Sequence, residues 1–161
     1  MAVTTNSAKV TLPEDTQILI TREFDAPKHL VWKAYTTPEL IRRWWAGTHG
    51  TVTVAEVDLR VGGSFRYALE TGDEKFEVAF HGEFREVQPT DRLVNTEIYE
   101  GAPEGFSVVT TTLTEVDGRT TLTQLCDYNS REVRDAVIDS GMEGGMQSSM
   151  DELEKVAASL S

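Results

Sequence analysis

Residues 141–160, GMEGGMQSSMDELEKVAASL, carry the pattern that decides the fold. Apolar residues recur there every three or four positions, which predicts a helix with one apolar stripe. Half of the stripe is methionine, a flexible side chain that adapts to surfaces of varying shape. The stripe is typical of core packing, and it also fits one wall of a ligand site. Its members are Met142, Met146, Met150, Leu153, Ala157 and Leu160.

Two glycines interrupt this predicted helix. Gly144 and Gly145 each cost roughly 1 kcal/mol relative to alanine inside a helix. A cost of that size predicts either a close approach of the helix backbone to a sheet or room for a ligand.

Seven segments typical of strands precede the helix. Paired glycines at Gly62 and Gly63 and the hairpin signal Asp117-Gly118 separate neighbouring segments, which indicates an antiparallel meander. One helix cannot cover seven strands, so a curved sheet wrapped around it leaves a space that a small molecule could occupy. The predicted strands are 16–24, 51–59, 64–70, 75–87, 92–99, 106–116 and 120–128.

Shorter helices complete a predicted α+β fold. Two of them follow the first strand, because Pro27 and the sequence Thr37-Pro38-Glu39 are both helix-start signals. The second helix groups Trp44 and Trp45 with two aliphatic residues; Trp44 is predicted to be core, and Trp45 is either core or part of an aromatic gate. A third short helix, 131–139, is predicted to begin at a capping box of Asn129 and Glu132.

The chain length fits one domain. Residues 1–15 are small, polar and aperiodic and are predicted to form a flexible N-terminal tail, whereas residues 16–161 form a single domain. No linker or internal repeat divides the second part.

Composition excludes several classes of function. The net charge of −12, from 27 acidic and 15 basic residues, repels nucleic-acid backbones and anionic lipid surfaces. The single cysteine, Cys126, allows neither an intrachain disulfide nor a thiolate zinc site. No apolar stretch is long enough to span a bilayer, so we expect a cytoplasmic protein, either a monomer or a weak homodimer.

Catalytic signatures are nearly absent. The sequence has no glycine-rich phosphate loop, no zinc-protease motif and no nucleophile elbow. Among three histidines, only His49, which follows the tryptophan pair, is a candidate acid or base, and a solvated loop histidine is the simpler interpretation. We expect neither a cofactor nor a metal.

Several motifs, in order along residues 17–160, resemble those of START-like, or SRPBCC, helix-grip domains. Within that superfamily the sequence is similar to the branch related to activators of the heat-shock chaperone ATPase. The motifs are Phe24-Asp25-Ala26-Pro27, Val31-Trp32-Lys33-Ala34-Tyr35, Trp44-Trp45, Asp58-Leu59-Arg60-Val61-Gly62-Gly63, His81-Gly82-Glu83-Phe84-Arg85 and Ser140-Gly141-Met142-Glu143-Gly144-Gly145-Met146.

The resemblance implies a seven-stranded antiparallel sheet that grips the C-terminal helix around a hydrophobic cavity. Relatives bind lipids, sterols, hormones or polyketides, and a few are cyclases or hydrolases. The superfamily has no universal catalytic residues to transfer to this chain, because fold does not fix function.

Residues and resemblance together predict a binding protein for a small hydrophobic or aromatic molecule. The alternatives are a cyclase or hydrolase acting on a polyketide-like or ester substrate, with His49 or a buried carboxylate as base, and a chaperone-interacting module. Tyr67, Gln124 and Tyr128 are the expected polar anchors. The full predicted site comprises Trp45, Phe65, Tyr67, Phe80, Phe84, Gln124, Tyr128, Met142, Met146 and Met150.

Overall fold

The computed structural model of the chain describes residues 7–48, 50–71, 76–103 and 105–160. The strands are β1 (Lys9–Thr11), β2 (Gln17–Phe24), β3 (Gly50–Val57), β4 (Ser64–Thr71), β5 (Phe76–Gln88), β6 (Arg92–Tyr99), β7 (Ser107–Val116) and β8 (Arg119–Asp127). The helices are α1 (Lys28–Thr36), α2 (Pro38–Trp44), α3 (Arg131–Asp139) and α4 (Met142–Ser159).

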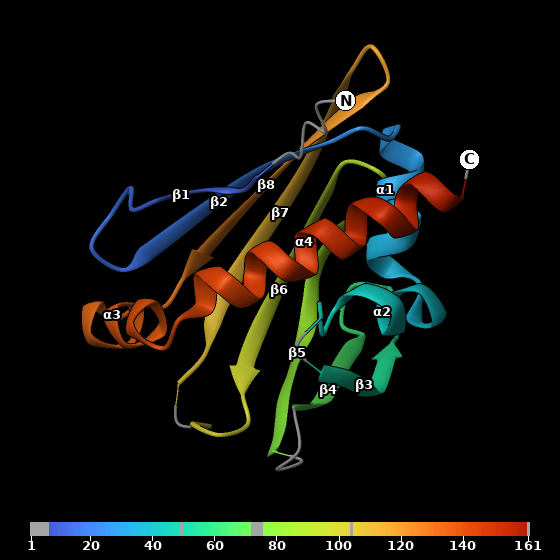
Figure 1. The fold of residues 1–161 in the computed structure, drawn as a ribbon. Helices are drawn as coiled ribbons and strands as arrows, with labels where there is room; N and C mark the ends of the chain where they lie inside the picture. Colours follow the sequence, from blue (N-terminus) through green and yellow to red (C-terminus); the bar gives the residue numbers. More distant parts are fainter. Residues whose placement is uncertain (1–6, 49, 72–75, 104, 161) are drawn as a thin grey trace.

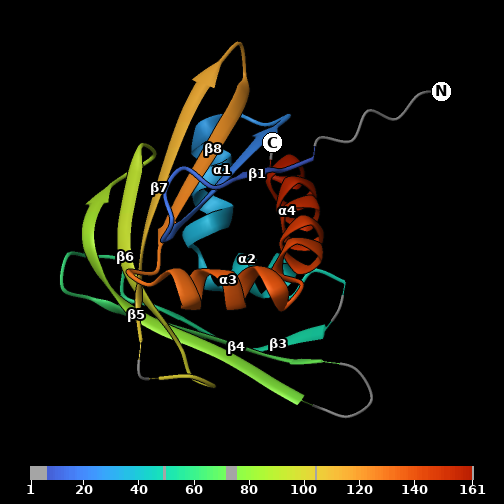
Figure 2. The ribbon, with the colours of Figure 1, turned by 90° about the vertical axis from the view of Figure 1, so that its left-hand side faces the viewer.

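All strands join one antiparallel sheet in the order β1-β2-β8-β7-β6-β5-β4-β3. Strands β3 to β8 follow one another as hairpins. The last of them, β8, then pairs with β2 in the register Gln17↔Asp127 to Phe24↔Thr120. The sheet curves around the helices, which lie together on its inner face (Figures 1 and 2). The predicted α+β helix-grip architecture, with two short helices after the first long strand, is confirmed.

Strand β1 was not predicted. It lies within the segment 1–15 that composition assigned to a flexible tail, and it pairs with β2 through Val10↔Ile20. Three residues are too few to show an alternating pattern, so the strand is defined by its neighbours rather than by its own sequence. The sheet therefore has eight strands in this structure, one more than expected.

The N-cap of α3 differs from the prediction by one residue, although the helix bounds agree. Asn129 has a left-handed backbone, with φ of 54°, which turns the chain before the helix begins. Ser130 is consequently the N-cap, and its hydroxyl accepts a hydrogen bond from the backbone N–H of Val133 at 3.2 Å.

The main core lies beneath the C-terminal half of α4, residues 150–159. Leu153 and Ala157 are fully buried there, and α4 packs on α1 and α2. Val31 of α1 and Phe24 of β2 are equally inaccessible and belong to the same cluster. The apolar stripe read from the sequence is therefore a packing surface over this half of the helix.

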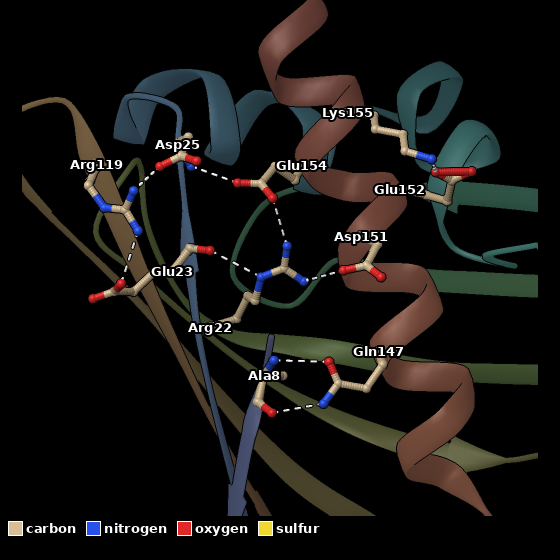
Figure 3. Close-up of polar contacts among 10 residues, drawn as sticks. All are labelled: Ala8, Arg22, Glu23, Asp25, Arg119, Gln147, Asp151, Glu152, Glu154 and Lys155. Carbon is tan, nitrogen blue, oxygen red and sulfur yellow. Dashed lines mark hydrogen bonds and ion pairs between the residues drawn. The ribbon is translucent and has the colours of Figure 1, made fainter. Parts of the chain in front are cut away.

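A charged clamp holds the same half of α4 to β2 (Figure 3). The guanidinium of Arg22, 1% exposed, contacts Asp151 and Glu154, each at 2.8 Å, and lies 5.1 Å from the centre of the Phe24 ring. Glu154 also accepts a hydrogen bond from the backbone N–H of Asp25 at 2.8 Å. Since Arg22 is inaccessible, these carboxylates supply the partners that a buried charge requires.

Neutral hydrogen bonds hold the N-terminal half of α4, residues 142–149. The side-chain amide of Gln147 bonds both the N–H and the carbonyl of Ala8, at 2.9 and 2.8 Å (Figure 3). The close backbone approach expected at Gly144 and Gly145 is wrong, because a Cβ atom at either position would meet nothing within 4 Å. The close approach lies instead at Gly47, where a Cβ atom would be 2.4 Å from the Ser148 hydroxyl.

Candidate functional site on the inner face of the sheet

An aromatic group lies where the loop after α2 meets the inner face of the sheet. The ring of Trp45 is 5.5 Å from that of Tyr67 and 5.8 Å from that of Phe80, in the second case edge to face. Tyr67 on β4 and Phe80 on β5 are direct cross-strand partners. The Ser149 hydroxyl donates to the Trp45 carbonyl at 2.8 Å and ties this loop to α4. All three rings are half-buried.

Further aromatic residues extend this group along the strands. The Phe65 ring lies 5.0 Å from Tyr67 and 5.5 Å from Phe84, and Tyr99 lies 5.2 Å from Phe80. A Cβ atom at Gly82 would come 1.9 Å from the Thr96 carbonyl oxygen and 2.8 Å from the Phe65 ring, so the glycine allows both to approach closely. The structure brings Trp45 together with the four aromatic strand positions predicted for the site; their role in binding stays a prediction.

A polar group occupies the middle of the inner face. Gln124 Nε2 on β8 donates to Tyr35 Oη at 2.7 Å and to Thr111 Oγ1 at 3.3 Å. Tyr35 comes from α1 and stacks on Trp44, with ring centres 5.5 Å apart. Burial raises the pKa of Tyr35 to about 12, so its hydroxyl stays protonated. Gln124 thus has the polar environment expected of it, with partners on α1 and β7 that the sequence did not predict.

Tyr128 and Cys126 add a second polar pair at the end of β8. Their side chains are hydrogen-bonded to each other, and burial raises the pKa of Cys126 to about 12. Burial also raises the pKa of Tyr128, so both groups stay neutral near neutral pH.

Glu97 on β6 is the residue that sequence reasoning missed. It lies on β6 between Asn95, the cross-strand partner of Phe84, and Tyr99, the cross-strand partner of Phe80, which places it on the inner face beside the aromatic group. Burial raises its pKa to about 7. The side chain is half-buried.

Alternation along β6 explains why Glu97 was missed. Leu93, Asn95 and Glu97 face inward, whereas Thr96 and Ile98 line the outer face. The inward set is the more polar one, so hydrophobic alternation alone favours the wrong face. Only the order of the neighbouring strands, which the sequence does not state, could have identified Glu97.

The methionines of α4 differ in how deeply they are buried. Met150 is buried, whereas Met142 and Met146 are half-buried and pack against the main core cluster together with Tyr67 and Tyr128. Phe65 and Phe84 form an adjoining cluster with Leu93, and Tyr67 packs against both clusters.

The remaining titratable candidates lie elsewhere. His49 lies outside the described residues. His81 is on the outer face, where its Nδ1 is 3.0 Å from Glu100, and the hydrogen-bonded Arg66 holds the pKa of Glu100 at about 2. A surface hollow of about 500 Å³ adjoins this group on the outer face, and Phe65 of the predicted site also lines it.

Within the described ranges, no three or more histidine, cysteine, aspartate or glutamate side chains are grouped so that they could hold a metal ion. The helices in those ranges are too short or too polar to cross a membrane.

The family model described as activator of Hsp90 ATPase homolog 1-like protein matches residues 25–158. The chain belongs to this AHSA1-like family. No curated protein matches the sequence.

Solved structures of bacterial proteins share the AHSA1-like fold. A protein of Rhodobacter sphaeroides is 26% identical, with a TM-score of 0.86, 94% of this chain covered and 99% of the other. A Mycobacterium smegmatis protein is 27% identical, with a TM-score of 0.83 and coverage of 93% and 96%. A protein of Arthrobacter aurescens is 25% identical, with a TM-score of 0.83 and coverage of 94% and 91%. These structures support the SRPBCC helix-grip assignment along the domain.

Proposed function

We propose that this AHSA1-like domain binds a small hydrophobic or aromatic molecule between the inner face of the sheet and the N-terminal half of α4. The observation that carries the proposal is the exposure of Trp45, Tyr67 and Phe80. Their rings point toward one another from three elements, yet each is only half-buried. Aromatic surface that faces inward and stays accessible can gain contact area from a ligand.

The polar groups nearby fit the second requirement of a ligand site, a few donors and acceptors that fix orientation. Hydrogen bonds already join Gln124 to Tyr35 and Thr111, so these polar groups are held in fixed positions on the inner face. Tyr67 and Glu97 form no side-chain hydrogen bond or ion pair with the described residues and are the groups free to bond a ligand.

The test is thermal unfolding and tryptophan fluorescence against a panel of lipids, flavonoids, polyketides and aromatic acids. A ligand at 100 times its dissociation constant adds about 2.7 kcal/mol to the free energy of unfolding. The Met146→Trp variant should lose the hit, because a larger ring at this half-buried position takes up space where α4 packs against the core cluster.

Glu143→Trp is the matched control, since Glu143 is exposed on the same half of α4. It should retain the hit. A folded protein that binds no member of the panel, or a hit that both variants retain, contradicts the proposal.

Glu97 favours a second function, catalysis on an ester or polyketide-like substrate. A carboxylate with a pKa of about 7 can accept and return a proton near neutral pH. Hydrolysis of a neutral aryl ester by wild type, lost in Glu97→Gln while binding of the ester persists, would support this function. His49→Ala tests the other candidate base in the same assay. Equal rates in wild type and both variants would exclude these two bases.

The family description favours a third function, contact with a chaperone ATPase. The ATPase rate of a purified Hsp90-type chaperone, measured with and without the domain, tests it. A change that survives Met146→Trp would indicate an outer surface rather than the inner face, whereas an unchanged rate counts against the chaperone function.

A further inference from the structure

We infer that the ligand is a cationic amine on an apolar or aromatic body, with its ammonium group bound to the Glu97 carboxylate. The inference rests on the proposed function, because it names the chemical class of ligand for the same inner-face site. It follows from the position of Glu97, from the charge of its surroundings and from the aromatic residues beside it.

The first step is that Glu97 lacks a partner. Its backbone carbonyl accepts a hydrogen bond from the Ser107 hydroxyl, but its carboxylate forms no hydrogen bond or ion pair with any described residue. The charged clamp on the same side of the sheet shows the usual arrangement, in which Arg22 has two carboxylates within 2.8 Å. A carboxylate left without such partners inside a fold is an available acceptor.

The second step is the charge of the surroundings. The titratable groups that face Glu97 are Tyr35 from α1, Tyr67 from β4, and Cys126 and Tyr128 from β8. All four have raised pKa values and are neutral at neutral pH. No cation from the described residues contributes to the pKa of Glu97. The site therefore holds one titrating acid and no base, which disfavours anionic ligands and favours cations.

The third step concerns desolvation. Folding has already removed much of the water from Glu97, as its raised pKa shows. An ammonium group that enters the site loses its own hydration but does not add the cost of desolvating the carboxylate. The buried ion pair is consequently more favourable here than where both groups leave water on binding.

The fourth step is the apolar half of the ligand. Trp45, Tyr67 and Phe80 offer ring faces and edges within one group, and Glu97 lies beside it, because Tyr99, two residues along β6 on the same face, is the cross-strand partner of Phe80. Rings of this kind attract cations through their faces and stack on aromatic bodies. The site thus combines an acceptor for an ammonium with a surface for the carbon skeleton attached to it.

The experiment compares three probes that share a naphthyl body and differ in the polar group. Naphthylethylamine, naphthylethanol and naphthylacetate are titrated into the folded domain by calorimetry. We expect the amine to bind at least about tenfold more tightly than the alcohol, the range measured for charge-assisted hydrogen bonds, and the carboxylate to bind most weakly. The preference for the amine should grow between about pH 6 and about pH 8, as Glu97 ionises.

Glu97→Gln should bring the amine down to the affinity of the alcohol, remove the pH dependence and leave the alcohol within about twofold of wild type, because the isostere keeps the packing. Glu83→Gln, on the exposed outer side of β5, is the matched control and should leave all three affinities unchanged. Thermal unfolding confirms that each variant is folded.

The possible failures are distinguishable. Equal affinity for the three probes, or an amine preference that persists in Glu97→Gln, overturns the inference and leaves the proposed function standing. If the domain binds an acidic member of the panel but none of the three probes, the inference is likewise overturned and the proposed function stands. Binding of no compound at all overturns the proposed function, and the inference with it.

Discussion

The two halves of α4 differ in how they are held. The C-terminal half has fully buried Leu153 and Ala157 and the ionic contacts of Arg22, whereas the N-terminal half has half-buried Met142 and Met146 and neutral hydrogen bonds. Both halves carry the same apolar stripe. The difference indicates that one half contributes most of the packing free energy, while the other leaves the aromatic residues of the sheet accessible.

The largest expected effect tests the packed half. Leu153→Ala removes a fully buried side chain and should lower the free energy of unfolding by about 3 kcal/mol. Met146→Ala, the matched truncation in the accessible half, should cost about 1 kcal/mol or less, because solvent already reaches part of the side chain. Urea unfolding measures both variants, and equal losses would show that the halves do not differ.

The second-largest loss of stability is expected at the charged clamp. Arg22→Met keeps the length of the side chain but leaves two carboxylates without their partner. We expect a loss of about 2 kcal/mol, toward the lower end for a broken buried pair, because Asp151 is 51% exposed and can rehydrate. Arg119→Met, on the exposed pairs with Glu23 and Asp25, should cost less than about 1 kcal/mol. A loss at Arg119 as large as that at Arg22 would contradict a special role for burial.

The titration of Glu97 should make the stability of the protein depend on pH. Its folded pKa of about 7 lies above its ordinary value of 4.5, so between these values the folded chain binds more protons than the unfolded chain. The contribution of Glu97 to stability is therefore greatest in acid and falls as pH rises through this window, by on the order of 2 kcal/mol.

Glu97→Gln removes this titration. The variant should consequently be more stable than wild type at pH values above about 7 and should gain nothing in mild acid. Denaturant unfolding across the pH range measures the difference. Glu83→Gln is the control, and parallel pH profiles for wild type and Glu97→Gln would show that the carboxylate is not desolvated.

The smallest effect concerns the glycines. Gly144 and Gly145 are exposed in the helix and have space for a Cβ atom, so Gly144→Ala should stabilise the protein by about 0.5–1 kcal/mol. The thermal midpoint measures this gain. If the same variant also weakens binding of a panel ligand, flexibility of the N-terminal half contributes to entry; unchanged affinity would limit the effect to helix propensity.

Sequence reasoning predicted the elements better than the site. Periodicity and turn chemistry are local properties, so the bounds of β6 and α3 were predicted to the residue. The partners of Gln124 are not local, because Tyr35 and Thr111 come from other elements. Glu97 was missed because a polar residue on an inward strand face breaks the pattern on which such predictions depend.

The pairing of β2 with β8 has a consequence for biosynthesis. Gln17 of β2 pairs with Asp127 of β8, so the sheet can be completed only after β8 has been synthesised. The hairpins from β3 to β7 pair strands that are consecutive in the sequence, so they can form before β2 is paired with β8. Because α4 follows β2 to β8 in the sequence, the helix that clamps Arg22 is synthesised after the strand that it holds in place.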